Sequence, residues 1–295
     1  GEFNDFSELE RITRRTACVL AEPVQGEAGV RPPRPGYLEA LRRRCDEVGA
    51  LLMEYICHER KALGTMPEHP VAVKTIVTTD IVSKMAEEYG VELREVLTGF
   101  KFIGEQIGFL EAKGEDSRYI FGFEESYGYL AGSYVRDKDA VVASMLICEM
   151  AAFYRTKGIS LLEARDKMYA KYGNYLHSQE SFVCEGASGM ERMKEIMADL
   201  RTNTPKEIGG LKVLRFGDYM ASEEVDLATG AKTAITLPKS DVLAFRLEQN
   251  ASVIIRPSGT EPKIKAYYTT IGESREAAKK LEATIAGDFK KILGF

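Results

Sequence analysis

The chain has 295 residues, which is enough for two ordinary domains or one large domain with an appendage. Its composition, 44% hydrophobic and 29% charged, is typical of a globular protein, and no apolar run approaches the roughly 18 residues that a membrane-spanning helix needs. No secretory signal opens it, and a net charge of −5 gives no overall attraction for nucleic acid. We therefore expect a protein that binds neither membranes nor nucleic acid.

The cysteines indicate neither a disulfide framework nor a metal site. The five of them are odd in number, widely spaced and without a C-x-x-C pair, at Cys18, Cys45, Cys57, Cys148 and Cys184. Buried thiols in a reducing, cytoplasmic environment are the expected state, with metal or disulfide use as the alternative.

Up to about residue 185 the chain alternates between strand-like and helix-like patterns. The predicted elements, in order, are a short strand at 17–21, a Gly/Pro-rich loop at 26–35, helices at 37–48 and 50–63, a β-branched strand at 71–77, a helix from Asp80 to Gly90, a strand at 95–97, a helix ending near 113, a strand at 119–123, a long helix at 139–154, and a helix that begins with a Ser160/Glu163 capping box and ends near 172. This rhythm predicts an α/β domain with a mostly parallel sheet and helices on both faces.

The rhythm changes after about residue 200. Short strands joined by turns are predicted at 211–216, 242–248, 251–256 and 263–270, followed by an amphipathic helix at 273–293. This order is typical of a small α+β domain. We place the boundary between the two domains at residues 203 and 204, within a polar, Gly/Pro-containing stretch.

The strongest chemical signal is the motif R-P-S-G-T-E-P-K, from Arg256 to Lys263, between two predicted strands. Arg256 offers a planar fork that matches two phosphate oxygens, and Ser258 and Thr260 offer hydroxyl donors. Gly259 allows the backbone N–H groups to turn inward as an anion nest, and Lys263 adds a charge at the rim. The pattern predicts a phosphate-binding loop; a Pro/Gly hairpin with a surface ion pair is the alternative.

A second signal is G-F-E-E-S-Y-G, residues 122–128, which follows a predicted parallel strand. Ligands of open α/β sheets bind at the carboxyl ends of the strands. Glu124 and Ser126 alternate with Glu125, so these two side chains are suited to contact vicinal hydroxyls. An acid-rich helix start would give a similar pattern.

One further loop and one lysine are candidates for a functional role. Thr98 and Gly99 stand in the loop after another predicted strand, and Lys138 stands at the start of a helix, where the helix dipole disfavours a cation. The three histidines show no metal-binding spacing.

Taken in order, T-G-F-K-F-I-G, G-F-E-E-S-Y-G-Y, R-D-K-D-A and R-P-S-G-T-E-P-K resemble the third and fourth domains of the α-D-phosphohexomutases, nearest to the phosphoglucomutase/phosphopentomutase branch. The resemblance covers about residues 48–295. It implies that Thr98 and Gly99 line the sugar site, that Glu124 and Ser126 bind sugar hydroxyls, and that Lys138 contacts the phosphosugar. It also implies that the non-reacting phosphate binds Arg256, Ser258, Gly259, Thr260 and Lys263. The implied partner is glucose 1-phosphate or 6-phosphate, or ribose 1-phosphate.

The motifs that perform phosphoryl transfer in this family have no counterpart in the chain. The family uses a phosphoserine in a T-x-S-H-N-P-like loop and a Mg²⁺ held by D-x-D-x-D. No serine here is followed by histidine, and the single D-x-D, Asp137-Lys138-Asp139, has no third aspartate. The resemblance therefore implies binding without turnover, with no catalytic residue or cofactor in this chain and Mg²⁺ expected only in a full-length enzyme.

The first fifty residues resemble a different family. L-A-E-P-V-Q-G-E-A-G-V (residues 20–30) and the stretch at 35–52 are similar to class III, acetylornithine-type aminotransferases. The aspartate-bearing strand that would hold pyridoxal phosphate does not follow. Residues 1–60 also contain nine Arg and no Lys, whereas the remainder contains eleven Arg and twenty Lys. We predict a chimera with an aminotransferase-like segment at 1–50, a domain 3-like part at 51–203 and a domain 4-like part at 204–295.

Three hypotheses about function stay open at the level of the sequence. The chain is a mutase fragment that binds a phosphosugar, a structural chimera without useful ligand binding, or a remnant of pyridoxal-phosphate chemistry. The missing aspartate motif argues against the third.

Overall fold

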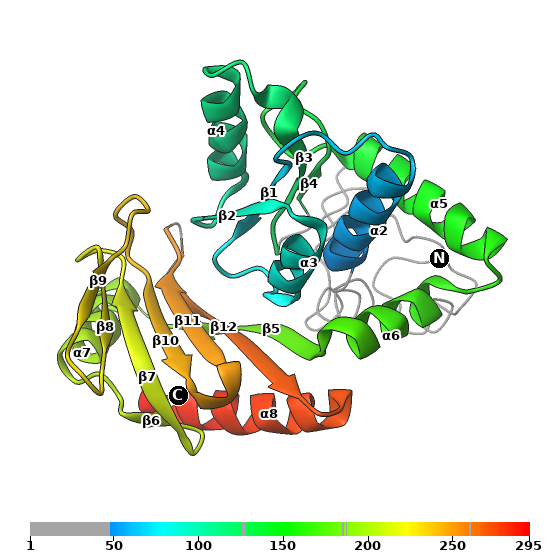
Figure 1. The fold of residues 1–295 in the computed structure, drawn as a ribbon. Helices are drawn as coiled ribbons and strands as arrows, with labels where there is room; N and C mark the ends of the chain where they lie inside the picture. The colour runs from blue at the N-terminus through cyan, green and yellow to red at the C-terminus, as the bar shows by residue number, and fades with distance from the viewer. Residues whose placement is uncertain (1–47, 126–127, 185, 187, 260) are drawn as a thin grey trace, which may run out of the picture. The chain divides into compact units, whose positions relative to one another are not determined.

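The computed structural model describes residues 48–295 apart from 126, 127, 185, 187 and 260. These residues form two compact units, which are drawn in Figure 1. The first unit holds residues 48–75, 82–95 and 99–172, and the second holds 76–81, 96–98 and 173–295. Each unit has a sheet of its own.

The first part of the chain alternates between helices and strands, as its sequence predicts. Its elements are α2 (Val48–Ala62), β1 (Val71–Thr75), α3 (Ile81–Tyr89), β2 (Glu92–Val96), α4 (Phe100–Glu111), the 3-10 turn η2 (Asp116–Arg118), β3 (Tyr119–Phe123), β4 (Tyr129–Leu130), α5 (Ala140–Thr156) and α6 (Leu161–Tyr172). The capping box before α6 is confirmed, because Ser160 N–H donates to Glu163 Oε2 at 2.7 Å and Glu163 N–H donates to Ser160 Oγ at 3.2 Å. The strand predicted at 17–21 and the helix predicted at 37–48 lie outside the described residues, except for Val48.

The four-stranded sheet has the order β2-β1-β3-β4 and is mixed but mostly parallel. β1 and β3 pair in parallel, and the short β4 pairs antiparallel with β3. Glu92 N–H donates to the Pro70 carbonyl and Ile76 N–H to the Val96 carbonyl, so β2 runs in the same direction as β1. The carboxyl ends of β1, β2 and β3 therefore share one edge of the sheet.

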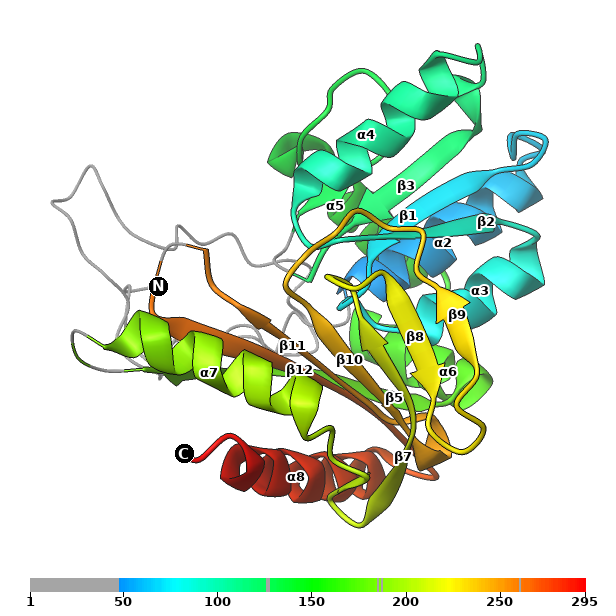
Figure 2. The ribbon, with the colours of Figure 1, turned by 90° about the vertical axis from the view of Figure 1, so that its left-hand side faces the viewer.

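Apolar residues on both sides of this sheet form its core. β1 and β3 are buried along their whole length, as expected of central parallel strands. Figure 2 shows α4 on one side of the strands and α2 and α3 on the other. α2 buries Leu52, Met53 and Ile56, and α4 buries Ile103 and Ile107.

The second unit is an antiparallel α+β domain. Its elements are β5 (Asn174–Val183), α7 (Gly189–Thr202), β6 (Glu207–Ile208), β7 (Leu211–Asp218), β8 (Glu223–Asp226), β9 (Lys232–Ala234), β10 (Leu243–Leu247), the 3-10 turn η3 (Glu248–Asn250), β11 (Ser252–Pro257), β12 (Lys263–Gly272) and α8 (Arg275–Ile292). The predicted strands correspond to β7, β10, β11 and β12, and the predicted terminal helix corresponds to α8. β5, α7, β6, β8 and β9 were not predicted from the sequence.

The sheet of this unit has eight strands in the order β5-β12-β11-β10-β7-β8-β9, with β6 attached to β7. Figure 2 shows α7 and α8 on the same side of it. Residues of that side, such as Ile264 and Tyr268 of β12, form one apolar core with Met197 of α7 and Ile285 and Phe289 of α8.

The position of β5 explains why the predicted domain boundary differs from the division into compact units. It pairs with β12 over ten residue pairs, from Lys263↔Val183 to Gly272↔Asn174, and so belongs to the antiparallel sheet. The compact units consequently divide after Tyr172, whereas the predicted domain boundary stands at 203 and 204. The alternating α/β rhythm therefore ends near residue 172 and not near 185.

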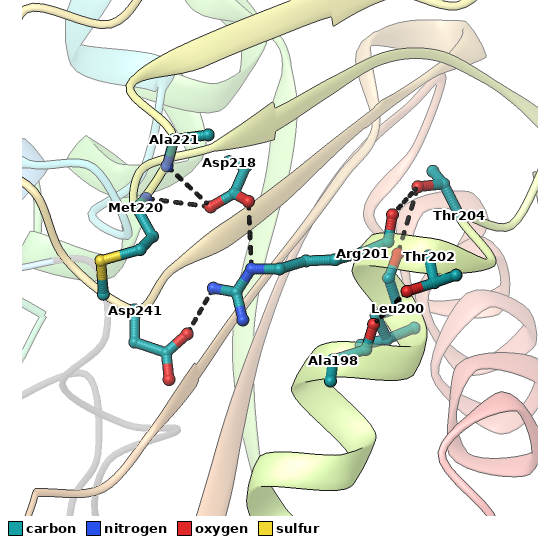
Figure 3. Close-up of polar contacts among 9 residues, drawn as sticks. All are labelled: Ala198, Leu200, Arg201, Thr202, Thr204, Asp218, Met220, Ala221 and Asp241. Atoms are coloured by element: carbon teal, nitrogen blue, oxygen red, sulfur yellow. Dashed lines mark hydrogen bonds and ion pairs between the residues drawn. The ribbon is translucent and has the colours of Figure 1, made fainter.

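An ion-pair cluster around Arg201 fixes one end of this sheet to α7 (Figure 3). The Arg201 guanidinium donates to Asp218 Oδ2 at the end of β7 (3.0 Å) and to Asp241 Oδ1 just before β10 (2.5 Å). Asp218 Oδ1 also accepts from the backbone N–H of Met220 (2.9 Å), which fixes the turn into β8. Burial by itself lowers the pKa of Arg201, but the hydrogen bonds to Asp241 and Asp218 outweigh it and raise that pKa.

The cysteines follow the expected pattern only in part. Cys57 and Cys184 are buried, and burial raises the pKa of the Cys57 thiol to about 12. Cys148 on α5 is exposed, which corrects the expectation of buried thiols. Cys18 and Cys45 lie outside the described residues. None of the helices in the described part of the chain has the length and hydropathy to cross a membrane.

Candidate functional site

The loop after β3 carries two acidic side chains at the shared carboxyl edge of the parallel strands. Glu124 is only 7% exposed, and its N–H donates to the Gly128 carbonyl at 3.0 Å. Glu125 Oε2 accepts from Thr75 Oγ1, at the end of β1, at 2.9 Å. Ser126, predicted to act with Glu124, lies outside the described residues. The prediction that Glu124 follows the carboxyl end of a parallel strand is confirmed. Its role in binding stays a prediction.

Lys138 lies beside Glu124, so the structure brings together two residues that the sequence singled out separately. The Lys138 Nζ atom is 3.9 Å from Glu124 Oε1, 3.3 Å from Asp137 Oδ1 and 5.6 Å from the centroid of the Phe100 ring. The Lys138 side chain is about half exposed, at 52%. This arrangement leaves the ammonium accessible next to a buried carboxylate.

Two glycines permit this close arrangement. A Cβ on Gly128 would lie 2.8 Å from Glu124 Oε1 and 2.7 Å from the Phe100 ring. A Cβ on Gly104, in α4, would lie 2.2 Å from the Arg136 carbonyl oxygen. Only glycine therefore lets α4 approach the segment that leads to Lys138.

Thr98 and Gly99 lie in the loop between β2 and α4, as predicted. Both residues are partly buried, and Gly99 has a φ of 113°, a left-handed backbone conformation that side chains disfavour. The loop thus turns at the carboxyl end of β2 directly into the first turn of α4.

A buried lysine at the same edge was not predicted from the sequence. Lys74, near the end of β1, is 0% exposed, and its Nζ atom is 2.8 Å from Glu95 Oε1 at the end of β2. A buried lysine requires such a partner, since an isolated charge in an apolar core is costly. The signal was available as one charged residue within the β-branched run at 71–77, next to the predicted carboxyl end of the strand.

In the second unit, R-P-S-G-T-E-P-K forms the connection between β11 and β12. The strands pair up to Arg256↔Lys265 and Pro257↔Ile264, and Ser258 N–H then closes the turn onto the Lys263 carbonyl at 2.8 Å. Arg256 is partly buried and its Nε–H donates to the Tyr267 hydroxyl at 3.3 Å. Thr260 lies outside the described residues.

Two details of this loop bear on the expectation. Gly259 is not among the described glycines with a positive φ, and, its two chain neighbours apart, no atom of the described residues lies within 4 Å of the position that a Cβ would take there. Lys263 forms an ion pair with Glu261 of the same loop. That contact, first as a hydrogen bond and then through charge, lowers the pKa of the Glu261 carboxyl. The Cβ position of Gly259 is therefore open with respect to the described residues, and Lys263 is engaged by a carboxylate.

Asp137 and Asp139 are engaged in hydrogen bonds around the start of α5. Asp139 caps α5 through the N–H groups of Val141 and Val142, and the Tyr134 hydroxyl donates to it at 2.7 Å. Asp137 accepts from both the backbone and the side chain of Lys138, which lowers its pKa. Among the described residues, no group of three or more His, Cys, Asp or Glu side chains is placed to hold a metal ion.

Comparison with protein families agrees with this arrangement of two units. Residues 44–172 match the model of "Phosphoglucomutase/phosphomannomutase, alpha/beta/alpha domain III", and residues 205–287 match that of "Phosphoglucomutase/phosphomannomutase, C-terminal domain". Residues 2–54 match the class-III aminotransferase model. The chain therefore contains domain III and the C-terminal domain of this family, in that order. It belongs to the phosphoglucomutase/phosphomannomutase family through domains III and IV and begins with a short class-III aminotransferase segment.

Individual relatives support the same assignment. The phosphoglucomutase of Staphylococcus aureus MRSA252 is 36% identical over 284 residues, which is 96% of this chain and 50% of that protein. The phosphoglucomutase of S. aureus RF122 is 36% identical over 241 residues, which is 81% of this chain and 42% of that protein. The chain therefore spans about half the length of the curated relatives it matches.

A solved structure shows the same fold. The open form of pp63/parafusin, a phosphoglucomutase from Paramecium, superposes with a TM-score of 0.57 at 19% identity, over 85% of this chain and 42% of that one.

Proposed function

We propose that this chain binds a phosphosugar, with the sugar hydroxyls taken by residues in the loops after β2 and β3 and before α5, and the non-reacting phosphate by the β11–β12 loop. The sugar-binding set is Thr98, Gly99, Glu124, Ser126 and Lys138. The phosphate-binding set is Arg256, Ser258, Gly259, Thr260 and Lys263. Glucose 1-phosphate or 6-phosphate is the proposed ligand, with ribose 1-phosphate as the pentose alternative.

One observation carries the phosphate assignment. Arg256 stands near the last paired positions of β11, with its Nε–H held by Tyr267, and in the loop that follows no described residue other than the chain neighbours lies within 4 Å of a Cβ position at Gly259. A guanidinium whose Nε is held still has its two terminal nitrogens for a phosphate, which is the bidentate geometry that arginine favours.

The sugar assignment rests on the pair formed by Glu124 and Lys138. A buried carboxylate accepts hydrogen bonds from hydroxyls, and an ammonium 3.9 Å away limits the cost of keeping that carboxylate charged. Relatives of this chain are named phosphoglucomutases, and a phosphoglucomutase acts on phosphorylated glucose. One of these relatives is 36% identical to this chain over 96% of the chain's length.

We further propose that the chain does not turn the sugar over by itself. The sequence has no serine followed by histidine and no D-x-D-x-D run, and Asp137 and Asp139 are engaged in the helix start. A coupled phosphoglucomutase assay should therefore give no turnover, and robust activity of the chain alone would overturn this part of the proposal. The cytoplasmic location stays a prediction.

The binding proposal is tested by isothermal titration with glucose 1-phosphate. We expect saturable binding at millimolar ligand or below, and Arg256→Ala should weaken it by about 1.5–3 kcal/mol, the scale of a hydrogen bond to a charged group. Absence of saturation at millimolar ligand would favour the alternative, a structural chimera without useful ligand binding.

Arg246→Ala is the matched control. Arg246 lies on β10 opposite Ser252, at the other end of β11 and on the same side of the sheet as Arg256. Arg246→Ala removes an equal charge from the same sheet. Its affinity for glucose 1-phosphate should stay within about twofold of that of the wild type, because Arg246 is partly exposed and salt largely screens a charge that far from the loop. Equal losses in both variants would mean that general charge, and not the loop, governs binding.

A further inference from the structure

Arg256 is the first member of a row of side chains that crosses three strands on one face of the second sheet. Arg256 is paired with Lys265, so Tyr267 is its diagonal neighbour on β12. Thr269 is paired with His177, so His177 of β5 is in turn the diagonal neighbour of Tyr267. The row therefore places the Tyr267 hydroxyl next to Arg256, the arginine of the proposed phosphate-binding loop.

The contacts in this row are specific. Arg256 Nε–H donates to the Tyr267 hydroxyl at 3.3 Å, and the guanidinium carbon is 5.9 Å from the centroid of the Tyr267 ring. The Tyr267 ring is 2% exposed and lies nearly parallel to the His177 ring, with centroids 6.4 Å apart and an interplanar angle of 22°. His177 Nδ1 lies 3.1 Å from Thr269 Oγ1, so the third member of the row is held as well.

We infer that Tyr267 is a positioning residue for the phosphate site, because it holds the Nε of Arg256 and thereby directs the two terminal nitrogens at the anion. An arginine side chain has several rotatable bonds, and holding Nε removes much of this freedom before the ligand arrives. This inference rests on the proposed phosphosugar binding at the β11–β12 loop. Tyr267 itself is not expected to touch the ligand.

The first test needs no ligand. Tyr267→Phe removes only the hydroxyl and keeps the buried ring, and Tyr268→Phe is the matched control on the adjacent residue, whose ring faces α8 and lies 6.3 Å from Phe289. In ¹H–¹⁵N spectra of arginine side chains, the Arg256 Nε–H signal is assigned by its loss in Arg256→Lys. We expect Tyr267→Phe to shift that signal and speed its exchange with water, and Tyr268→Phe to leave it in place. An unshifted signal in Tyr267→Phe would overturn the inference.

The second test links the contact to binding. Tyr267→Phe should weaken binding of both glucose 1-phosphate and inorganic phosphate about fivefold in the wild-type background, and should change it by less than about twofold in an Arg256→Lys background, where no guanidinium is left to orient. Equal losses in the two backgrounds would mean a general structural effect and would overturn the inference.

The two proposals fail in different ways. If the wild type binds no phosphosugar, the proposed function fails, and the Nε–H signal still decides whether Tyr267 holds Arg256. If the wild type binds and Tyr267→Phe binds equally well, the proposed function stands and the positioning role is wrong.

Discussion

The two units hold their charged loop residues by different physical means. In the first unit, the segment before α5 is placed by close packing of backbone on backbone, since Gly104 allows the Arg136 carbonyl to approach where a Cβ would overlap it. In the second unit, the loop end of the sheet is held by strand register, by the hydrogen bond from Arg256 on β11 to Tyr267, and by the ion pairs of the Arg201 cluster at the ends of β7 and β10.

This difference has a consequence for how each unit responds to change. Steric placement is insensitive to salt and pH but does not tolerate one added methyl group. Placement by ion pairs tolerates changes of volume but depends on both partners remaining charged. A substitution that removes one kind of support should therefore reduce stability where that support exists. The same kind of substitution should have little effect at a neighbouring position that lacks it.

The largest effect is expected from Gly104→Ala. The new Cβ would lie 2.2 Å from a backbone oxygen that cannot move aside as a side chain would, so we expect a loss of about 2–3 kcal/mol of stability from overpacking. Urea unfolding followed by circular dichroism measures this loss, and hydrogen exchange of α4 and 133–139 peptides locates it.

Gly108→Ala, one turn later in α4, is the matched control. Apart from its own helix backbone, no atom of the residues that the structure describes lies within 4 Å of the Gly108 Cβ position, so the substitution should raise stability by up to about 1 kcal/mol through helix propensity. If both variants were equally stable, the close approach at Gly104 would not be what places the Lys138 segment.

The second-largest effect is expected from Arg201→Met. Removal of the guanidinium leaves the Asp218 and Asp241 carboxylates without their shared cation, and Asp218 is only 16% exposed. We expect a loss of about 2 kcal/mol, below the roughly 3–5 kcal/mol of a fully buried pair because Arg201 itself is 27% exposed.

Lys194→Met, on the same helix α7 but at an exposed position, is the control for this charge change. Urea unfolding should show no loss beyond about 0.5 kcal/mol for it. A loss in Lys194→Met equal to that in Arg201→Met would attribute the effect to the net charge of α7 and not to the cluster.

Much of this support was not predictable from the sequence, for reasons that differ between the units. The strands β11 and β12 and the phosphate-loop motif were correctly placed, because β-branched runs on either side of a Pro/Gly turn are local signals. The Ser160/Glu163 capping box is local as well. By contrast, β5 reads N-Y-L-H-S-Q-E-S-F-V, which has no regular alternation of apolar residues, and only its ten pairs with β12 make it a strand.

Tertiary contacts account for the remaining misses. The pairing of Lys74 with Glu95 depends on the order of β1 and β2 in the sheet, and the role of Gly104 depends on the return of residue 136 to α4. Neither is encoded by spacing along the chain. The anion nest at Gly259 stays a prediction, since the described residues show only that its φ is not positive and that, its chain neighbours apart, none of their atoms lies within 4 Å of its Cβ position.

A third prediction concerns ligand affinity and not stability. Lys138→Met should weaken glucose 1-phosphate binding about tenfold, which corresponds to the roughly 1.5 kcal/mol of a weak hydrogen bond to a charged group. Lys101→Met is the control, because Lys101 is also exposed in the first unit but contacts the Phe102 ring, at 4.8 Å. Isothermal titration compares the two, and equal affinities would remove Lys138 from the sugar-binding set.

The smallest effect is expected from Glu261→Gln, which removes the carboxylate that occupies Lys263. Glu261 competes with an incoming phosphate for the same ammonium and adds a like charge near it, so the variant should bind glucose 1-phosphate about two- to threefold more tightly, a small factor because exposed pairs are weak. Glu273→Gln, beyond the other end of β12, should leave the affinity unchanged. The gain should also shrink as salt is raised from 20 to 500 mM, because screening weakens exposed charges.

The pH dependence of this gain follows from the direction of the Glu261 pKa. Lys263 lowers that pKa, so the ion pair is fully present above the ordinary glutamate range and is lost as pH falls through the lowered value. The wild type should therefore bind glucose 1-phosphate more weakly than Glu261→Gln from pH 8 down to about pH 5. The two affinities should become similar only at more acidic pH, where Glu261 is protonated. A ratio of affinities that did not change between pH 7 and the acid limit, or a variant that bound more weakly than the wild type, would show that Glu261 supports the loop rather than competing for Lys263.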